Sequence, residues 1–310
     1  MWEKPKLGLA LGAGGARGVA HIGVLKALEA AGVEISYLAG SSIGALVGAA
    51  YAVTRNAADL ETRLMDFLSG DSYQASGLLL VREALADRGE TVTRRLETWL
   101  KRTYLQAKLV ARPAILDSGL FRAVIEHFVP KMNIEDLPLP FRALGTDLVS
   151  GRPVVFQGGP LRDAVYASAA IPGLVAPLEK GGMQIVDGGV INMVPALPVR
   201  HMGAEAVLAV DVEKTITQEE HPGAALDLLF RVEDVQNYYL REIQLREADL
   251  VLSPKVGHLH WSDFPQAAEM IQLGQDEAEG RLEEIRALVR RRWRRWRRPA
   301  RPPARAWITI

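Results

Sequence analysis

Residues 37–51 read Tyr-Leu-Ala-Gly-Ser-Ser-Ile-Gly-Ala-Leu-Val-Gly-Ala-Ala-Tyr, and this stretch decides the fold. The apolar run from Tyr37 to Ala39 predicts a strand, and the Ala-rich run that begins at Ala45 predicts a helix. Between them lies a G-x-S-x-G pentapeptide centred on Ser42, which is the pattern of a nucleophile elbow, a sharp strand-to-helix turn that exposes a serine. In a chain with 28 glycines the pentapeptide could arise by chance, but its strand and helix context favours the elbow.

The two flanking glycines, Gly40 and Gly44, support this interpretation, because a sharp turn leaves no room for Cβ atoms beside the serine. The N–H groups and the positive dipole end of the following helix would then lie close to the Ser42 hydroxyl. The stretch therefore predicts a serine that can be activated to attack an ester.

A second glycine-rich turn precedes the elbow. Residues 6–11 predict a buried strand, residues 12–18 (Gly-Ala-Gly-Gly-Ala-Arg-Gly) a loop and residues 19–31 a helix. A dinucleotide-binding fold also begins with strand, glycine loop and helix, but here the sixth position of its G-x-G-x-x-G fingerprint is Arg17, and no P-loop Gly-Lys-Ser/Thr is present. The unobstructed backbone N–H groups of the loop could instead converge on an anionic oxygen.

The remaining chain continues to alternate between strands and helices. Helices are expected over residues 57–68, 81–110, 118–129, 163–170, 195–201, 224–246 and 265–290, and strands over 142–147, 152–156, 184–187, 206–211 and 250–252. The strands 142–147 and 152–156 predict a β-hairpin across Ser150-Gly151. This alternation predicts a three-layer α/β/α sandwich with a mostly parallel central sheet.

Composition limits the class of protein. With 310 residues, 48% of them hydrophobic, the chain is long enough for one large core. It contains no cysteine, which excludes disulfides and thiolate metal sites and fits a reducing compartment. No segment has the length of a membrane span, and the N-terminal apolar stretch is too short and glycine-rich for a signal peptide. We expect a cytoplasmic protein that uses no metal or other cofactor.

Charge is distributed unevenly although the formal net charge is zero. Residues 290–310 hold nine arginines and no acid, so residues 1–289 carry 28 basic against 37 acidic residues. The interpretation that assigns no function to the Arg- and Trp-rich run Arg290–Arg298 is a flexible, solvated tail. The functional interpretation is peripheral contact with an anionic membrane, which attracts basic residues and interfacial tryptophan; nucleic acid is the other candidate polyanion and ranks second.

The serine needs a proton acceptor, and the sequence offers two kinds. The histidines best placed for a Ser-His-Asp triad are His258 and His260, but neither follows a recognisable strand in the usual hydrolase order. Asp187 ends a strand and is followed by Gly188-Gly189, which leave space for a close approach to the elbow. Asp187 is therefore the better candidate.

Four segments together resemble the patatin-like phospholipases, particularly their bacterial members. They are residues 14–25, the elbow 40–44, the run 167–173 (Ala-Ser-Ala-Ala-Ile-Pro-Gly) and Asp187-Gly188-Gly189. Their order along the chain is the specific signal, and the resemblance covers roughly residues 6–290. It implies one patatin-like domain over residues 1–289, followed by the basic tail 290–310, expected to be flexible.

The resemblance also implies roles for individual residues. Ser42 corresponds to the nucleophile and Asp187 to the general base of a Ser-Asp dyad that hydrolyses acyl esters of lipids. The oxyanion hole maps onto the backbone N–H groups around Gly14, Gly15, Ala16 and Arg17, with Arg17 at the family's basic position. Ala13 departs from the family, whose loop usually begins with a third glycine; its methyl group could narrow the acyl entrance.

Three functions compete at this point. The first is a serine acyl hydrolase that acts on phospholipid, lysophospholipid or a simpler ester. The second is a nucleotide- or dinucleotide-binding protein that uses the Gly12–Gly18 loop. The third is a catalytically inactive scaffold that recruits partners through its arginine tail. Covalent labelling of Ser42 by a fluorophosphonate separates the first from the other two.

Overall fold

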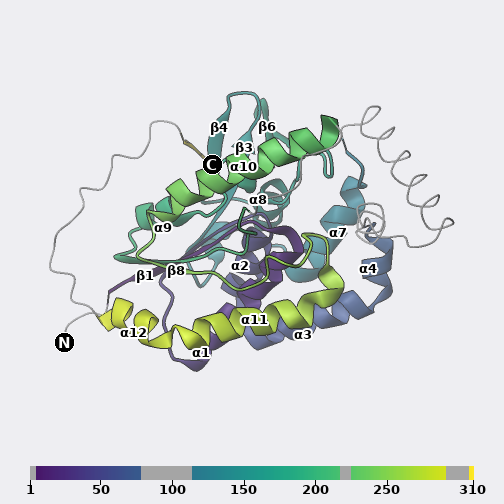
Figure 1. The fold of residues 1–310 in the computed structure, drawn as a ribbon. Helices are drawn as coiled ribbons and strands as arrows, with labels where there is room; N and C mark the ends of the chain where they lie inside the picture. Colours follow the sequence, from purple (N-terminus) through teal and green to yellow (C-terminus); the bar gives the residue numbers. More distant parts are fainter. Residues whose placement is uncertain (1–4, 78–113, 217–224, 291–306) are drawn as a thin grey trace.

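A computed structural model describes residues 5–77, 114–216, 225–290 and 307–310 (Figure 1). Within them the strands form one nine-stranded sheet with the order β5-β6-β3-β2-β1-β7-β8, while β4 pairs with β3 and β9 with β4. The strands are β1 (Leu7–Leu11), β2 (Tyr37–Ser41), β3 (Phe141–Asp147), β4 (Arg152–Phe156), β5 (Leu178–Lys180), β6 (Met183–Asp187), β7 (Ala206–Val210), β8 (Leu250–Leu252) and β9 (Ile308–Thr309).

The centre of the sheet is parallel. β3, β2, β1, β7 and β8 run in one direction, whereas β4, β5 and β6 join through antiparallel pairs. β3 and β4 form the β-hairpin expected from the sequence. The predicted α/β/α architecture with a mostly parallel sheet is confirmed.

Helices cover both faces of the sheet (Figure 1). They are α1 (Ala20–Ala30), α2 (Ile43–Thr54), α3 (Ala57–Ser69), α4 (Asp71–Ala75), α7 (Ser118–Phe128), α8 (Leu161–Ser168), α9 (Ala196–His201), α10 (Ala225–Leu245), α11 (Ala267–Gly280) and α12 (Leu282–Arg290). Short 3₁₀ turns lie at Gly15–Val19, Ile134–Asp136, Gly188–Val190 and Phe264–Gln266. None of the described helices combines the length and the hydrophobicity that crossing a bilayer requires.

The two cores follow from the two-residue period of the strands. Leu7, Leu9 and Leu11 face the larger core, which includes residues of α1, α2, α3, α7 and α11. Ala10 and its neighbours on the opposite face contribute to a smaller core with α9. Small side chains on that second face allow α9 to approach the sheet closely.

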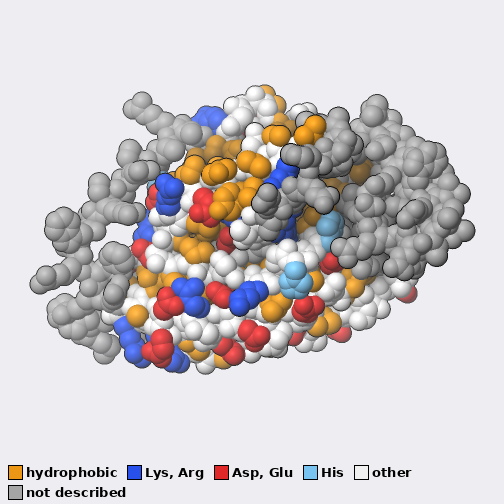
Figure 2. All heavy atoms as spheres, in the orientation of Figure 1, with side chains coloured by type: hydrophobic (Ala, Val, Ile, Leu, Met, Phe, Trp, Pro, Cys, Tyr) orange, Lys and Arg blue, Asp and Glu red, His pale blue; other side chains and the backbone are white. Residues whose placement is uncertain are grey.

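Helix α10 is amphipathic in an unusual sense. Its polar side chains bind the body of the protein: Gln244 donates to the Ile191 carbonyl and Arg241 pairs with Asp211. Several of its apolar side chains face outward, where Figure 2 shows a hydrophobic band over the helix, whereas Leu245 packs against the smaller core. The exposed large residues of this band are Leu228, Val232, Tyr239 and Ile243.

Some sequence expectations differ from the structure, and others fall on residues that the structure does not describe. The helix predicted over 265–290 is two helices, because the chain breaks at Gly280-Arg281, where Arg281 has non-helical dihedral angles and glycine favours a helix end. Strand β5 was not predicted. The helices expected over 81–110 lie outside the described residues. Within the tail expected to be flexible, residues 308–309 pair with β4.

Candidate active site

The site is built where two strands meet end to end. β4 pairs with residues 143–147 along one edge of β3, so β2 and β6 share the other edge. β2 runs parallel to β3 and reaches Leu144 with Ser41, whereas β6 runs antiparallel and reaches Gly145 with Asp187. The carboxyl ends of β2 and β6 therefore meet at two consecutive residues of β3, which brings Ser42 and Asp187 together.

The glycines of the elbow are required by close backbone contacts. A Cβ atom on Gly40 would lie 2.2 Å from the carbonyl oxygen of Gly44, and one on Gly44 would lie 2.3 Å from the carbonyl oxygen of Leu11. Ser42 itself has φ 57° and ψ −126°, a conformation that costs a non-glycine residue about 1–3 kcal/mol. The turn holds the serine at the N-terminus of α2, as the sequence predicted.

The Ser42 hydroxyl donates a hydrogen bond to Asp187. The distance from Ser42 Oγ to Asp187 Oδ2 is 2.6 Å, and the other carboxylate oxygen, Oδ1, accepts the N–H of Gly189 at 2.6 Å. Burial of the carboxyl group raises the pKa of Asp187 to about 7, although both hydrogen bonds oppose the rise. A carboxylate with a pKa near neutrality is a stronger base than an ordinary aspartate.

Two further groups hold the elbow in place. The backbone N–H of Ser42 donates to Ser168 Oγ at 3.1 Å, and the Ser41 hydroxyl donates to the carbonyl oxygen of Asn192. Gly188 lies against the same turn, since a Cβ there would be 2.3 Å from the carbonyl oxygen of Leu144. Sequence reasoning assigned no role to Ser168 or Asn192, because nothing in a single sequence indicates which loop contacts the elbow.

The Gly12–Gly18 loop lies beside the elbow, and many of its N–H groups are already bonded. Those of Gly12 and Ala13 donate to the carbonyl oxygens of Val210 and Met193, and that of Ala16 donates to Trp261 at 2.6 Å. Within the described part of the chain, the N–H groups of Gly14 and Gly15 have no such acceptor. Of the backbone N–H groups expected to stabilise an oxyanion, that of Ala16 therefore already has an acceptor within the protein.

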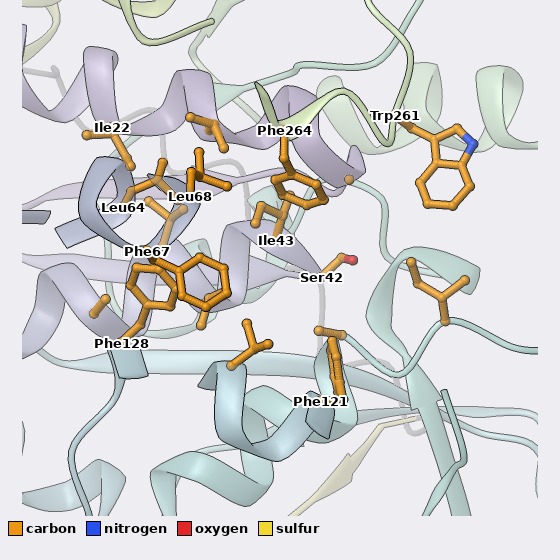
Figure 3. Close-up of a pocket in the computed structure, with 18 of the residues that line it drawn as sticks. Ile22, Ser42, Ile43, Leu64, Phe67, Leu68, Phe121, Phe128, Trp261 and Phe264 are labelled. Carbon is orange, nitrogen blue, oxygen red and sulfur yellow. The ribbon is translucent and has the colours of Figure 1, made fainter. Parts of the chain in front are cut away.

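An apolar pocket of about 110 Å³ opens beside Ser42 (Figure 3). In Figure 3 the serine lies close to Ile43, with most of the aliphatic and aromatic side chains on one side of it and Trp261 on the other. Apart from Ser42 and Gly15, every residue of the lining is apolar; those labelled are Ile22, Ile43, Leu64, Phe67, Leu68, Phe121, Phe128, Trp261 and Phe264. The arrangement joins a hydrogen-bonded hydroxyl to a space that suits a hydrocarbon chain.

Comparison with known families agrees with this geometry. Residues 9–200 match the family described as patatin-like phospholipase. The chain belongs to the patatin-like phospholipase family.

Relatives within the family differ in length. An uncharacterized NTE family protein of Mycobacterium tuberculosis is 36% identical over 215 residues, which are 68% of this chain and 50% of that protein. Human patatin-like phospholipase domain-containing protein 6 is 36% identical over 208 residues, 66% of this chain and 13% of that protein. The chain thus spans half, or less, of these relatives. The crystal structure of VipD from Legionella pneumophila aligns with 92% of this chain and 67% of its own, at 14% identity and a TM-score of 0.45.

In this family member the histidines considered as alternatives have other partners. His258 Nε2 lies 3.2 Å from Glu269 on an exposed surface, and His260 Nδ1 lies 2.7 Å from the hydroxyl of Ser262. His21 is fully buried, where Nε2 donates to the carbonyl oxygen of Gly12 at 2.8 Å. Burial lowers the pKa of His21 to about 4, so its imidazole is neutral at pH 7.

The described residues of this patatin-like domain contain no cluster of His, Asp and Glu side chains fit to hold a metal ion. The polar groups that line the site are the Ser42 hydroxyl, the Asp187 carboxylate and the backbone N–H groups of the glycine loop.

Proposed function

We propose that the protein is a serine acyl hydrolase that cleaves acyl ester bonds of lipids, in the manner of a phospholipase A or lysophospholipase, through a Ser42–Asp187 dyad. The observation that carries the proposal is the 2.6 Å hydrogen bond from Ser42 to Asp187 at the edge of an apolar pocket. Family membership supports the same class of reaction.

In the proposed mechanism Asp187 is the general base and Ser42 the nucleophile. As Ser42 Oγ forms a bond with the ester carbonyl carbon, its proton passes to Asp187 Oδ2. The tetrahedral intermediate collapses by breaking the bond to the leaving oxygen, which takes the proton back from Asp187. Water then attacks the acyl-serine and passes a proton to Asp187. The second tetrahedral intermediate collapses by breaking the bond between the acyl carbon and Ser42 Oγ, which takes the proton back from Asp187, so the carboxylic acid is released and the dyad is regenerated.

Negative charge develops on the carbonyl oxygen and needs donors. The N–H groups of Gly14 and Gly15 are the candidates, together with the N-terminus of α2, whose dipole is positive there. Loss of one oxyanion donor typically costs about 100-fold or more in rate. We expect these donors to supply much of the rate enhancement, because a carboxylate is a modest base for an alcohol.

The apolar pocket is proposed to hold the acyl chain. Each buried CH₂ group contributes about 0.8 kcal/mol, which corresponds to about fourfold in binding. With p-nitrophenyl esters of increasing chain length, kcat/KM should rise by about that factor per CH₂ until the pocket is filled. A kcat/KM that falls steadily from acetate to longer esters would contradict an acyl-binding role.

The decisive experiment is labelling with a fluorophosphonate probe. The native protein should be labelled at Ser42, and Ser42→Ala should be neither labelled nor active. Ser69→Ala is the matched control, because it removes an exposed hydroxyl on α3 that makes no contact with the elbow, and it should retain labelling. Absence of labelling on the folded native protein, together with inactivity on a panel of lipids and short esters, would reject the proposal.

The nucleotide-binding alternative gains no support from the loop that suggested it. The N–H groups of Gly12, Ala13 and Ala16 are bonded to carbonyl oxygens within the protein, so they are unavailable to a phosphate. We therefore favour the hydrolase.

The division into a patatin-like domain, residues 1–289, and a basic tail, residues 290–310, remains a proposal, as does contact with anionic membranes through Arg290–Arg298. Of that run, residues 291–298 lie outside the described structure. Co-sedimentation with phosphatidylserine-containing liposomes tests the contact. A variant with the seven arginines of the run changed to glutamine keeps residues 307–310 and should bind less, most clearly at low salt; equal binding, or binding only to added DNA, would contradict it.

A further inference from the structure

Arg17 links the glycine loop to a distant carboxylate. Its Nη2 lies 2.7 Å from Glu213 Oε2, and its Nε donates to the carbonyl oxygen of Gly14 at 3.3 Å. The Arg17 side chain is 7% exposed and that of Glu213 17%. A guanidinium with its donors fixed in one plane can make both contacts at once, which a lysine ammonium could not reproduce with the same geometry.

The carbonyl that Arg17 holds belongs to the Gly14–Gly15 peptide. In a planar trans peptide the C=O and the N–H point in opposite directions, so fixing the Gly14 oxygen also fixes the direction of the Gly15 N–H. Gly15 lies in the pocket lining with Ser42, and its φ of +57° is accessible chiefly to glycine. On the other side, the hydrogen bond from Ala16 to Trp261 holds the next peptide.

Glu213 is connected to a second ion pair, between Asp211 and Arg241. Its backbone N–H donates to Asp211 Oδ1 at 3.1 Å, and Asp211 Oδ2 lies 3.2 Å from Arg241 Nε on α10. Both members of that second pair are buried. Two cations and two carboxylates therefore form a balanced set of charges, of the kind that is costly to interrupt at one member. This set connects α10 with the glycine loop.

We propose that Glu213 is a positioning residue: through Arg17 it sets the orientation of the Gly14–Gly15 peptide, and hence of the Gly15 N–H toward the oxyanion. The inference rests on the proposed function, in which that N–H stabilises the tetrahedral intermediate. Glu213 touches neither the substrate nor Ser42 in this scheme, so its removal should affect kcat and leave ground-state binding of the acyl chain unchanged.

The test compares three variants of the full chain on one p-nitrophenyl ester. Glu213→Ala, which frees the guanidinium, should lower kcat by about 10- to 100-fold with little change in KM, a smaller effect than loss of a donor itself. Glu213→Gln keeps a neutral acceptor and should recover part of that loss. Arg17→Lys should lower kcat like Glu213→Ala, and the double variant should be no worse than either single variant.

A trifluoromethyl ketone gives an independent readout, because it adds to the serine and places an oxyanion in the proposed hole. Its affinity should fall across the variants in parallel with kcat/KM, whereas the affinity of a non-covalent fatty alcohol should not change. Asp249→Ala is the matched control: Asp249 pairs with Arg200 at the same 2.7 Å, with a side chain 15% exposed, away from the loop. It should lower the melting temperature without changing kcat.

The outcomes are separable. If the native protein is inactive, or Ser42→Ala is as active as the native protein, the proposed function fails. If hydrolysis depends on Ser42 but folded Glu213→Ala and Arg17→Lys both retain kcat within twofold, the positioning role is wrong. Should Glu213→Ala not fold, Glu213→Gln and Arg17→Lys decide by the same criterion.

Discussion

The two glycine-rich turns of this protein follow neighbouring parallel strands, yet they are shaped in different ways. In the elbow after β2 the chain crowds itself: Gly40 faces Gly44, and Gly44 faces Leu11 of the adjacent strand. In the loop after β1 the crowding comes from afar, because a Cβ on Gly15 would lie 2.4 Å from the carbonyl oxygen of Trp261.

The residues placed at positive φ differ as well. Ser42 and Gly15 both have φ of 57°, but only glycine adopts that angle without strain. The elbow therefore has a strained backbone at the proposed nucleophile, and the loop has a relaxed backbone at the proposed oxyanion donor. The comparison teaches that the glycines of the elbow are required by the backbone of the elbow and of the adjacent strand, whereas Gly15 and Arg17 of the loop contact residues about 200 or more positions away.

The largest effect is expected at the elbow's partner. Asp187→Asn should lower kcat by about 10⁴-fold, because the proton acceptor is lost while the side chain keeps its shape. His258→Ala and His260→Ala should stay active in the same esterase assay. A folded histidine variant without activity would move the base to that residue.

Alanine substitutions at Gly44 of the elbow and Gly15 of the loop should affect stability and activity to different extents. Gly44→Ala should destabilise the protein by about 3 kcal/mol or more, since the methyl group meets backbone that cannot move. Gly15→Ala should also cost stability, because its methyl group meets the Trp261 carbonyl oxygen, but less than Gly44→Ala, since Trp261 lies in a turn and Leu11 in the central strand β1. It should lower kcat by about 100-fold as well, because it displaces the proposed donor. Thermal melting and steady-state kinetics measure the two effects; equal loss of stability in both variants would contradict the distinction.

The pH profile sharpens the assignment of the base. Because the pKa of Asp187 is about 7 and only its ionised form accepts a proton, kcat/KM should fall tenfold per pH unit below 7, to about one hundredth at pH 5. The same shift affects folding. The neutral, protonated form of Asp187 is the one that burial favours, so the raised pKa stabilises the folded state fully below about pH 4, and this stabilisation is lost as the pH rises through 7. At pH 8 Asp187→Asn, which stays neutral, should therefore have a higher melting temperature than the native protein. If kcat/KM fell only below about pH 4, burial would not raise the pKa of Asp187 in the way described.

The smallest effect concerns strain. Ser42→Gly should have a free energy of unfolding about 1–3 kcal/mol higher than that of Ser42→Ala, because both variants lose the hydroxyl but glycine adopts the positive φ without cost. Ser42→Ala, equally inactive but still strained, is the control. If urea unfolding gives the two variants the same stability, the elbow stores no strain at Ser42.

Much of the fold could be predicted because its signals are local. The Gly40 and Gly44 spacing, the apolar strands and the Asp117 cap of α7 all depend on neighbours in sequence. The end-to-end meeting of β2 and β6 on β3 could not be derived from spacing. It depends on strand register, which placed Ser41 opposite Leu144 and Asp187 opposite Gly145.

The candidate site was predictable to the same extent. Ser42 and Asp187 stand out in the sequence, and the structure brings them together. The contacts that shape the glycine loop could not be predicted. The Trp261 carbonyl oxygen that accepts the Ala16 N–H and the Glu213 carboxylate that pairs with Arg17 leave no pattern in a single sequence. Backbone acceptors in particular carry no side-chain signature at all.

The positive φ of Ser42 has an evolutionary consequence. If Ser42 is the nucleophile, as proposed, selection for stability and selection for turnover oppose each other at this position, since the replacement that relaxes the backbone also abolishes the reaction. A lineage released from the need to hydrolyse its substrate would gain stability by exchanging the whole serine side chain for a hydrogen atom, so under the proposed function glycine at position 42 would be expected in family members that have lost their activity.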